Sequence, residues 1–183
     1  MDAIVVGLDI SLVKTGLTII KTDGTVLFSG LIKSKPSGDS YLAETRRLVK
    51  IAEDVMEKID EFTPNGDPAL VVIENMAFAV RNTTALTQIA GLSHLVRILL
   101  AEFGWPVVLV APTSLKKFLT GSGKGDKDMV MMSIYKNYGF EAMDNNTADS
   151  YGLSVCGLAL LGKPLRKLGV PQQEVIKLLS RQL

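Results

Sequence analysis

Three acidic residues of this sequence stand where a charged side chain is costly. Asp9 and Glu74 each end a run of apolar residues, and Asp149 lies in a segment whose predicted helical surface is mostly apolar. A carboxylate that is buried alone carries a large desolvation penalty, so each of the three needs a compensating partner. Oxygen ligands without histidine or cysteine among them suit Mg²⁺ or Mn²⁺ rather than Zn²⁺. Because such ions activate water and stabilise leaving oxygens at phosphate esters, the three residues predict phosphoryl chemistry.

Two of these carboxylates are expected at one edge of a β-sheet. Residues 3–8 and 69–73 read as buried strands, and an amphipathic helix over 42–59 separates them. A strand–helix–strand crossover with parallel strands brings both strand ends to the sheet edge where ligands of α/β proteins collect. For Asp9 the alternative is that it caps its strand and pairs with Lys14, and this stretch alone leaves both readings open.

The remaining pattern predicts an α/β fold in which three strands are followed by a helix, a strand, a helix, a strand and then helices only, the last of them short. Turn residues separate the first three strands, which form an antiparallel meander. Apolar periodicity and helix-start residues predict the helices. The expected further strands are 14–21, 26–31 and 105–110, and the expected further helices are 82–101, 111–119, 127–138, 146–161 and a C-terminal one that starts at Pro171.

Composition limits the class of protein. The 183 residues are 47% hydrophobic, enough for one core, which we divide into a domain over 1–162 and a helical extension of it over 163–183. A net charge of +1 does not by itself indicate a polyanionic partner. The single cysteine, Cys156, excludes an internal disulfide and suits a reducing compartment. With no leader, and no apolar run of the roughly 18 residues that span a bilayer, we expect an intracellular protein without membrane contact.

Three motifs in this order resemble the RuvC-type Holliday-junction resolvases, nucleases of the ribonuclease-H-like superfamily. They are Gly7-Leu8-Asp9-Ile10-Ser11 with Thr15-Gly16, then Val72 to Asn82, and Asn146-Thr147-Ala148-Asp149-Ser150. Lys116 and Lys127 lie 11 positions apart on either side of a Gly/Ser loop, as the basic pair of that family does. The resemblance extends from about residue 3 to residue 162.

The resemblance implies a fold and an activity. The fold would be a mixed five-stranded sheet of order 3-2-1-4-5 flanked by helices. The activity would be metal-dependent resolution of Holliday junctions or other branched DNA by paired nicks, with Mg²⁺, or Mn²⁺ as the alternative, leaving 5′-phosphate and 3′-hydroxyl ends. A homodimer formed through the helix over 82–101 would make the two nicks, in the cytoplasm of a bacterial cell or phage-infected host.

The resemblance also implies roles for individual residues. Asp9, Glu74 and Asp149 would be catalytic metal ligands, and Lys127 would neutralise charge at the scissile phosphate. Phe78 would stack on a base near the crossover. The predicted DNA-binding set is completed by Arg81, Lys116, Lys117, Lys124 and Lys127.

Two positions depart from the family pattern. Asn146, three positions before Asp149, stands where the family usually has an acid, and Ile10-Ser11 replaces Pro-Gly. Asn146 shares a helix face with Asp149 and offers a neutral oxygen to a metal, although we expect it mainly to cap the helix. Asp144 is the alternative fourth ligand.

These departures leave two other functions open. One is a non-catalytic protein that binds branched DNA on the same scaffold. The other is an actin-like nucleotide-dependent kinase or ATPase, whose first strand and hairpin have a similar pattern, although the chain lacks the second phosphate loop that such proteins need.

Overall fold

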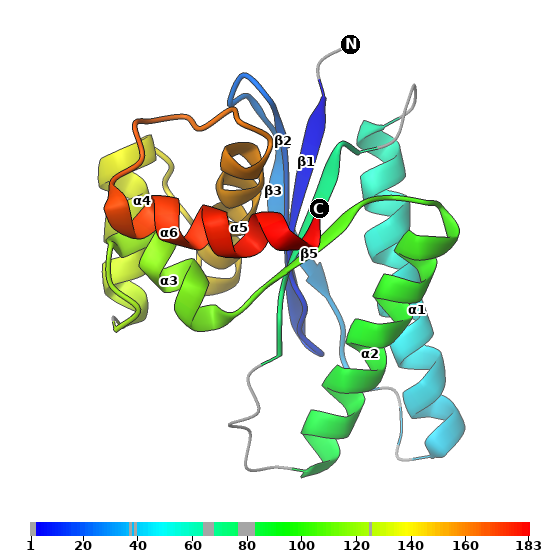
Figure 1. The fold of residues 1–183 in the computed structure, drawn as a ribbon. Helices are drawn as coiled ribbons and strands as arrows, with labels where there is room; N and C mark the ends of the chain where they lie inside the picture. The colour runs from blue at the N-terminus through cyan, green and yellow to red at the C-terminus, as the bar shows by residue number, and fades with distance from the viewer. Residues whose placement is uncertain (1–2, 37, 39, 64–67, 77–82, 125) are drawn as a thin grey trace.

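The computed structural model describes residues 3–36, 38, 40–63, 68–76, 83–124 and 126–183, with Thr83 and Lys127 described in their backbone only. Its centre is a five-stranded sheet of order β3-β2-β1-β4-β5, seen edge-on in Figure 1. β1 pairs antiparallel with β2 and parallel with β4, which confirms the mixed sheet and its order. The strands are β1 (Ile4–Asp9), β2 (Lys14–Lys21), β3 (Val26–Lys33), β4 (Leu70–Glu74) and β5 (Val107–Val110).

The central strand β1 is covered on both faces. Val5, Val6 and Leu8 have no exposed surface. Because side chains alternate along a strand, Val5 belongs to the core on one face of the sheet, whereas Val6 and Leu8 belong to the core on the other. This two-sided burial explains why the β1 sequence is an almost continuous apolar run.

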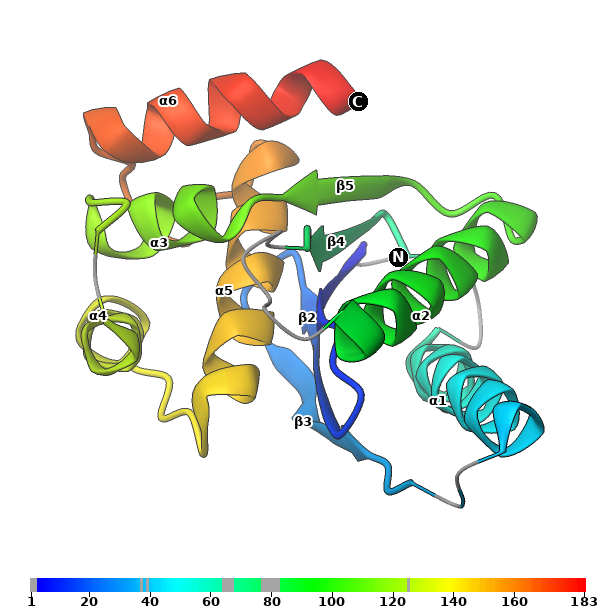
Figure 2. The ribbon, with the colours of Figure 1, turned by 90° about the horizontal axis from the view of Figure 1, so that it is seen from below.

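The helices form two layers around the sheet (Figures 1 and 2). One face carries α1 (Tyr41–Phe62) and α2 (Thr83–Glu102). α5 (Asn145–Leu160) crosses the other face. Outside α5 lie α3 (Pro112–Thr120), α4 (Lys127–Tyr138) and α6 (Val170–Leu179), and a single 3₁₀ turn (Ser180–Gln182) ends the chain.

Two glycines let α5 lie directly on β1 and β2. A Cβ atom added to Gly7 would stand 2.0 Å from the carbonyl oxygen of Ser150, and one added to Gly16 would stand 2.1 Å from that of Asn146. Real side chains do not tolerate such distances, so only glycine permits this approach. The hydroxyl groups of Thr18 and Ser150, 2.9 Å apart in a hydrogen bond, join β2 to α5 between the two glycines.

The start of α5 differs from the expectation. Asp144 is the N-cap residue, and its carboxylate accepts a hydrogen bond from the backbone nitrogen of Thr147 at 2.9 Å. The Thr147 hydroxyl bonds back to the nitrogen of Asp144 at 3.0 Å and completes a capping box. The prediction that Asn146 caps the helix was therefore wrong, because Asp144 has the extended backbone and the reciprocal partner that this role requires.

α2 is apolar on average, although polar residues interrupt its sequence. Over the described residues, the stretch Thr84–Glu102 is long and apolar enough to cross a membrane by length and composition alone. Scattered threonine, serine and glycine residues hide this character from a search for unbroken apolar runs. Leu92, Val96 and Leu100 are fully buried in the core shared with α1 and the sheet, although only 22% of the segment is buried inside the molecule.

The C-terminal residues pack on α3 and on the edge of the sheet. Val175 and Leu179 of α6 are buried, and the Gln172 side chain donates to the carbonyl oxygen of Phe118 at 3.1 Å. The Gln182 amide pairs with both backbone groups of Leu109 in β5, each at 2.9 Å. Gln182 thus occupies hydrogen-bonding groups that an edge strand would otherwise expose.

Candidate active site

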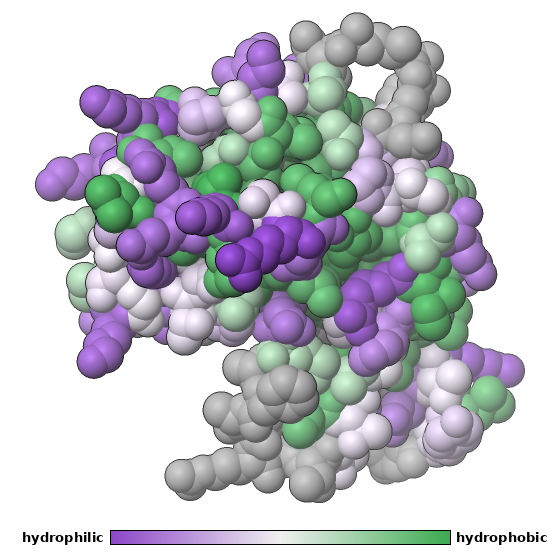
Figure 3. All heavy atoms as spheres, in the orientation of Figure 1, coloured by the Kyte–Doolittle hydropathy of each residue, from purple (hydrophilic) through white to green (hydrophobic). Residues whose placement is uncertain are grey.

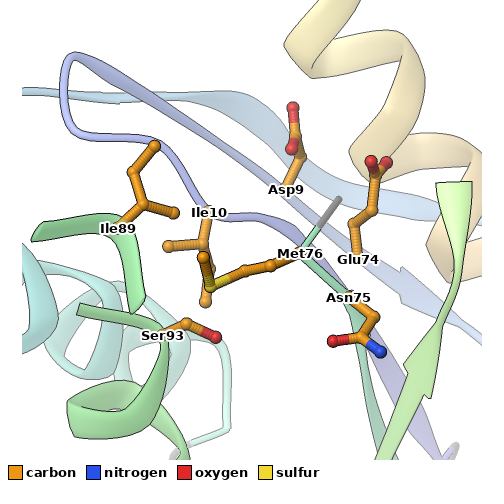
Figure 4. Close-up of a pocket in the computed structure, with 7 residues that line it drawn as sticks. All are labelled: Asp9, Ile10, Glu74, Asn75, Met76, Ile89 and Ser93. Atoms are coloured by element: carbon orange, nitrogen blue, oxygen red, sulfur yellow. The ribbon is translucent and has the colours of Figure 1, made fainter. Parts of the chain in front are cut away.

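Asp9 and Glu74 end adjacent parallel strands and lie side by side. The register pairs Leu8 with Ile73, so the next residue on each strand is one of the two acids. Both are half-buried and line one pocket. Figure 4 shows the two carboxylates pointing the same way, toward the side on which α5 lies. The pocket is completed by Ile10, Asn75, Met76, Ile89 and Ser93, of which the last two belong to α2.

α5 brings Asp149 toward the same corner of the sheet. Asp9 pairs with Gly16 on β2, and Gly16 touches the backbone of Asn146, one helical turn before Asp149. Ser150, the next residue, touches β1 at Gly7. Asp149 therefore lies between the two contacts that seat α5 on β1 and β2, and its side chain is half-buried.

The acidic residues do not form a compact cluster of three. In the described part of the chain, no group of three or more histidine, cysteine, aspartate or glutamate side chains is placed so that it could hold a metal ion. What the structure brings together is the pair Asp9 and Glu74 in one pocket, with the first turn of α5 against β2 beside it. Lys14, the alternative partner of Asp9, is exposed.

The side chain of Asn146 is bonded to the start of β2, next to the strand that carries Asp9, and does not cap α5. Its side-chain nitrogen donates to the carbonyl oxygen of Lys14 at 2.5 Å, so its amide oxygen is left as the acceptor. The carboxylate of Asp144, the alternative fourth ligand, is used for the helix cap. Both capping bonds use Oδ1 of Asp144, so within the described contacts each of the two residues keeps a side-chain oxygen that the cap does not use.

Two groups that sequence reasoning missed hold the turn after Asp9. The Thr15 hydroxyl accepts from the nitrogen of Ser11 at 3.1 Å and donates to its carbonyl oxygen at 2.8 Å. Arg47 of α1 donates through Nη2 to the carbonyl oxygen of Leu12. Thr15 is part of a quoted motif, but Arg47 lies 35 residues from Leu12, and no sequence signal connects them.

The predicted DNA-binding residues are only partly described. Lys116 is half-buried on α3, and Lys124 is exposed in the loop before α4. Lys117 is also on α3, but its ammonium group forms a 2.6 Å ion pair with Glu174 of α6. Lys127 begins α4, and its side chain lies outside the described part, as do Phe78 and Arg81.

The one cysteine does not offer a nucleophile. Cys156 is fully buried in α5, and burial raises the pKa of its thiol from 9.0 to about 12. A thiol with so high a pKa is protonated at neutral pH, and the thiolate is the reactive form. The chemistry of the site therefore rests on its oxygen ligands.

Comparison with known proteins decides the family. Residues 5–157 match the family model described as "Crossover junction endodeoxyribonuclease RuvC". The chain belongs to the RuvC family. A RuvC from Synechococcus sp. (strain WH7803) is 31% identical over 159 residues, which cover 84% of this chain and 96% of that protein. A RuvC from Corynebacterium glutamicum is 29% identical, with 83% of this chain and 67% of that protein covered.

Solved structures confirm the ribonuclease-H-like fold of the RuvC resolvases. Thermus thermophilus RuvC aligns with a TM-score of 0.69 and 22% identity, over 87% of this chain and 97% of that one. The T. thermophilus RuvC in complex with its Holliday junction substrate also gives 0.69, with 21% identity, over 83% and 90% of the two chains. Membership of the RuvC family decides against the actin-like kinase that the first hairpin also resembles.

Proposed function

We infer that this protein is a metal-dependent endonuclease that resolves Holliday junctions or other branched DNA by paired nicks. The observation that carries this conclusion is the pair of carboxylates, Asp9 and Glu74, in one pocket at the end of two parallel strands of a RuvC-family chain. Hydrolysis would leave 5′-phosphate and 3′-hydroxyl ends. Because the curated relatives are bacterial proteins named for action on DNA, we place this protein in the cytoplasm, that of a bacterial cell or phage-infected host.

The chemistry of the donors, rather than a ready-made cluster of three among the described side chains, suits a hard divalent cation. Asp9 and Glu74 supply carboxylate oxygens from adjacent strands, and Asp149 and Asn146 supply a carboxylate and an amide oxygen from one face of α5. These are the ligand types that Mg²⁺ and Mn²⁺ prefer, and we propose Mg²⁺, with Mn²⁺ as the alternative. When bound, such ions supply an activated water and stabilise charge on the phosphate.

The protein's own groups orient the substrate and the ligands. Thr15 fixes the turn after Asp9. The side-chain amide of Asn146 donates to the carbonyl oxygen of Lys14. These bonds restrict the positions of the two proposed metal ligands, Asp9 and Asn146. Asn146 brings no charge, so the site carries one negative charge fewer than the family's usual acid would give. This difference predicts weaker binding of a second cation.

Lysines on the α3 side would contact DNA phosphates. Lys116 and Lys124 form no ion pair within the described part of the chain, and we propose that both contact the DNA backbone. Lys117 would first have to leave Glu174. Lys127 is proposed to neutralise charge at the scissile phosphate. Lys116→Ala should weaken junction binding and lower the slope of log affinity against log salt by about 0.9.

The segment that follows Glu74 would read the crossover. We propose that Phe78 stacks on a base there and that Arg81 contacts the backbone. Support for both comes from their chain position, a few residues after a strand that ends in the acidic pocket. Phe78→Ala should slow nicking of a junction more than it weakens binding, as measured by single-turnover kinetics beside a binding titration.

We further propose that α2, the helix predicted over 82–101, joins two copies of the chain. An exposed stripe with helical spacing runs along it, and its members are uncharged: Thr84, Thr87, Gly91, His94 and Ile98. Figure 3 shows hydrophobic residues interspersed with hydrophilic ones at the surface over α2. The Ile98 side chain is 54% exposed, unusual for so apolar a residue, and a partner would cover it. Sedimentation of Ile98→Glu beside the wild type should shift a dimer toward the monomer.

The alternative is a protein that binds branched DNA without cutting it, and Asn146 is the observation that favours it. A labelled four-way junction incubated with Mg²⁺, with a linear duplex of the same sequence as control, separates the two functions. Paired nicks in the junction alone support the nuclease, and retention without nicks supports the binder. Asp9→Asn should abolish nicking but leave binding nearly intact, whereas joint loss of both would show that Asp9 is structural.

A further inference from the structure

A basic cleft lies outside the acidic pocket, where the chain leaves β3 and enters α1. We call it the α1 cleft, and its lining residues are Ser34, Lys35, Arg46, Arg47 and Lys50. Four of these five residues are cationic. No residue of the cleft belongs to the acidic pocket or to the lysines of α3 and the loop after it.

The floor of the α1 cleft is a side chain held in place by hydrogen bonds. Arg47 is half-buried, its Nε donates to the Ser34 hydroxyl at 2.9 Å, and its Nη2 donates to the carbonyl oxygen of Leu12. These two bonds fix the plane of the guanidinium group. In the described part of the chain its other terminal nitrogen, Nη1, makes no hydrogen bond, so it remains available to an acceptor in the cleft. A fixed guanidinium with free donors suits phosphate oxygens.

The rim of the cleft carries cations without partners. Lys35 and Arg46 are exposed, and neither forms an ion pair among the described residues. Lys50 is paired with Asp54 at 2.6 Å, but its side chain is 66% exposed, and such surface pairs contribute little to stability. Lys35 and Arg46 are therefore the groups most available to neutralise an anion, with Arg47 below them.

The α1 cleft and the acidic pocket open at the same end of the molecule. Leu12, which Arg47 holds, is three residues beyond Asp9. Figure 2 views the molecule from this end and places the start of α1 and the link between α3 and α4 on opposite sides of the sheet. Basic groups thus flank the end of β1 on two sides, and a DNA strand crossing the pocket toward α1 would meet the cleft.

We propose that the α1 cleft is a phosphate-binding subsite that holds the sugar-phosphate backbone of the DNA arm that leaves the acidic pocket on the α1 side. The proposal rests on the proposed nuclease function. It adds a second backbone contact, separate from the lysines of α3, and it links that contact to the turn after Asp9 through Arg47. Its effect is on the affinity and placement of the arm.

The test is a binding titration of a four-way junction, with Ca²⁺ in place of Mg²⁺, over a series of salt concentrations. The variant is Lys35→Ala with Arg46→Ala, both at exposed positions, and the matched control is Lys136→Ala with Lys177→Ala, two exposed lysines on α4 and α6. Two lost phosphate contacts should lower the slope of log affinity against log salt by about 1.8. The control should keep the wild-type slope.

Junctions with shortened arms identify the source of the effect. If the cleft holds an arm, shortening the arm should weaken wild-type binding and leave the variant with no further loss. A variant slope equal to that of the control, or the same loss on long and short arms, would overturn the proposal. Binding of inorganic phosphate to the cleft, with no change in the slope of log DNA affinity against log salt, would also overturn the proposal. That result would make free phosphate the ligand. Nicking by the wild type is scored separately with Mg²⁺, so failure of the nuclease function would be seen independently of the slopes.

Discussion

Gly16→Ala tests how the fold places Asp149 beside Asp9. A Cβ at residue 16 would stand 2.1 Å from the carbonyl oxygen of Asn146 and 2.7 Å from its carbonyl carbon, both backbone atoms of α5. The shorter contact must lengthen by about 1.3 Å to reach the 3.4 Å at which ordinary contact begins. Because the capping box and the Thr18–Ser150 bond make this turn rigid, the whole first turn of α5 must move.

The expected result has two parts. Overpacking of this size costs about 1–3 kcal/mol, which lowers the Tm of a chain of this length by roughly 2–12 °C. Displacement of the turn that carries Asn146 and Asp149 by about 1 Å should slow nicking about 100-fold. The measurements are a thermal melt and single-turnover nicking of a four-way junction with Mg²⁺, at a temperature where the variant is folded.

The matched control is Gly30→Ala. Gly30 lies on β3 in the same sheet, and a Cβ there would meet the far end of the Phe28 ring at 2.9 Å, a side chain that can move, rather than helix backbone. It should nick at the wild-type rate. Wild-type Tm and wild-type nicking by Gly16→Ala would refute the argument that close approach of α5 to β2 positions the site.

Three further predictions concern the metal, the core and the sheet edge. Asn146→Asp adds a carboxylate and loses the donor to the Lys14 carbonyl, so nicking should need less Mg²⁺ while the Tm falls, as Mg²⁺ titrations and melts would show. Burial raises the pKa of Cys156 to about 12, so above pH 9 the thiol ionises only in the unfolded chain. The free energy of unfolding should then fall by up to about 1.4 kcal/mol per pH unit between pH 9 and 12, and urea titrations should show less of this fall in Cys156→Ala. Gln182→Ala frees two backbone groups of Leu109 and should promote association through β5, measurable by light scattering, whereas an unchanged monomer–dimer balance would mean that the edge is protected otherwise.

The sequence predicted the arrangement that depends on local pattern. Apolar runs ending in Asp9 and Glu74, separated by one amphipathic helix, were enough to predict parallel strands with both acids at one edge, and the register bears this out. The order of the sheet followed from the family resemblance. Asp149 was recognised because a charge in an apolar helix is unusual.

What the sequence did not reveal depends on contacts between distant residues. The choice of Asp144 over Asn146 as helix cap depends on backbone angles and on the bond returned by Thr147. The ion pair of Lys117 joins residues 57 positions apart. The α1 cleft is assembled from two segments whose charges, taken one at a time, look like solvated surface.

The central claim is that Asp9, Glu74 and Asp149 act together on one divalent-metal site, although they come from three separate elements and the described structure does not hold them as a compact cluster of three. The most direct test is calorimetric titration of Mn²⁺ into the wild type and into Asp149→Asn, with Asp128→Asn, an acid on α4, as control. The account predicts binding at least about tenfold weaker in Asp149→Asn, a loss of about 1.4 kcal/mol, and no change in the control. Equal Mn²⁺ affinity in the wild type and Asp149→Asn would contradict it.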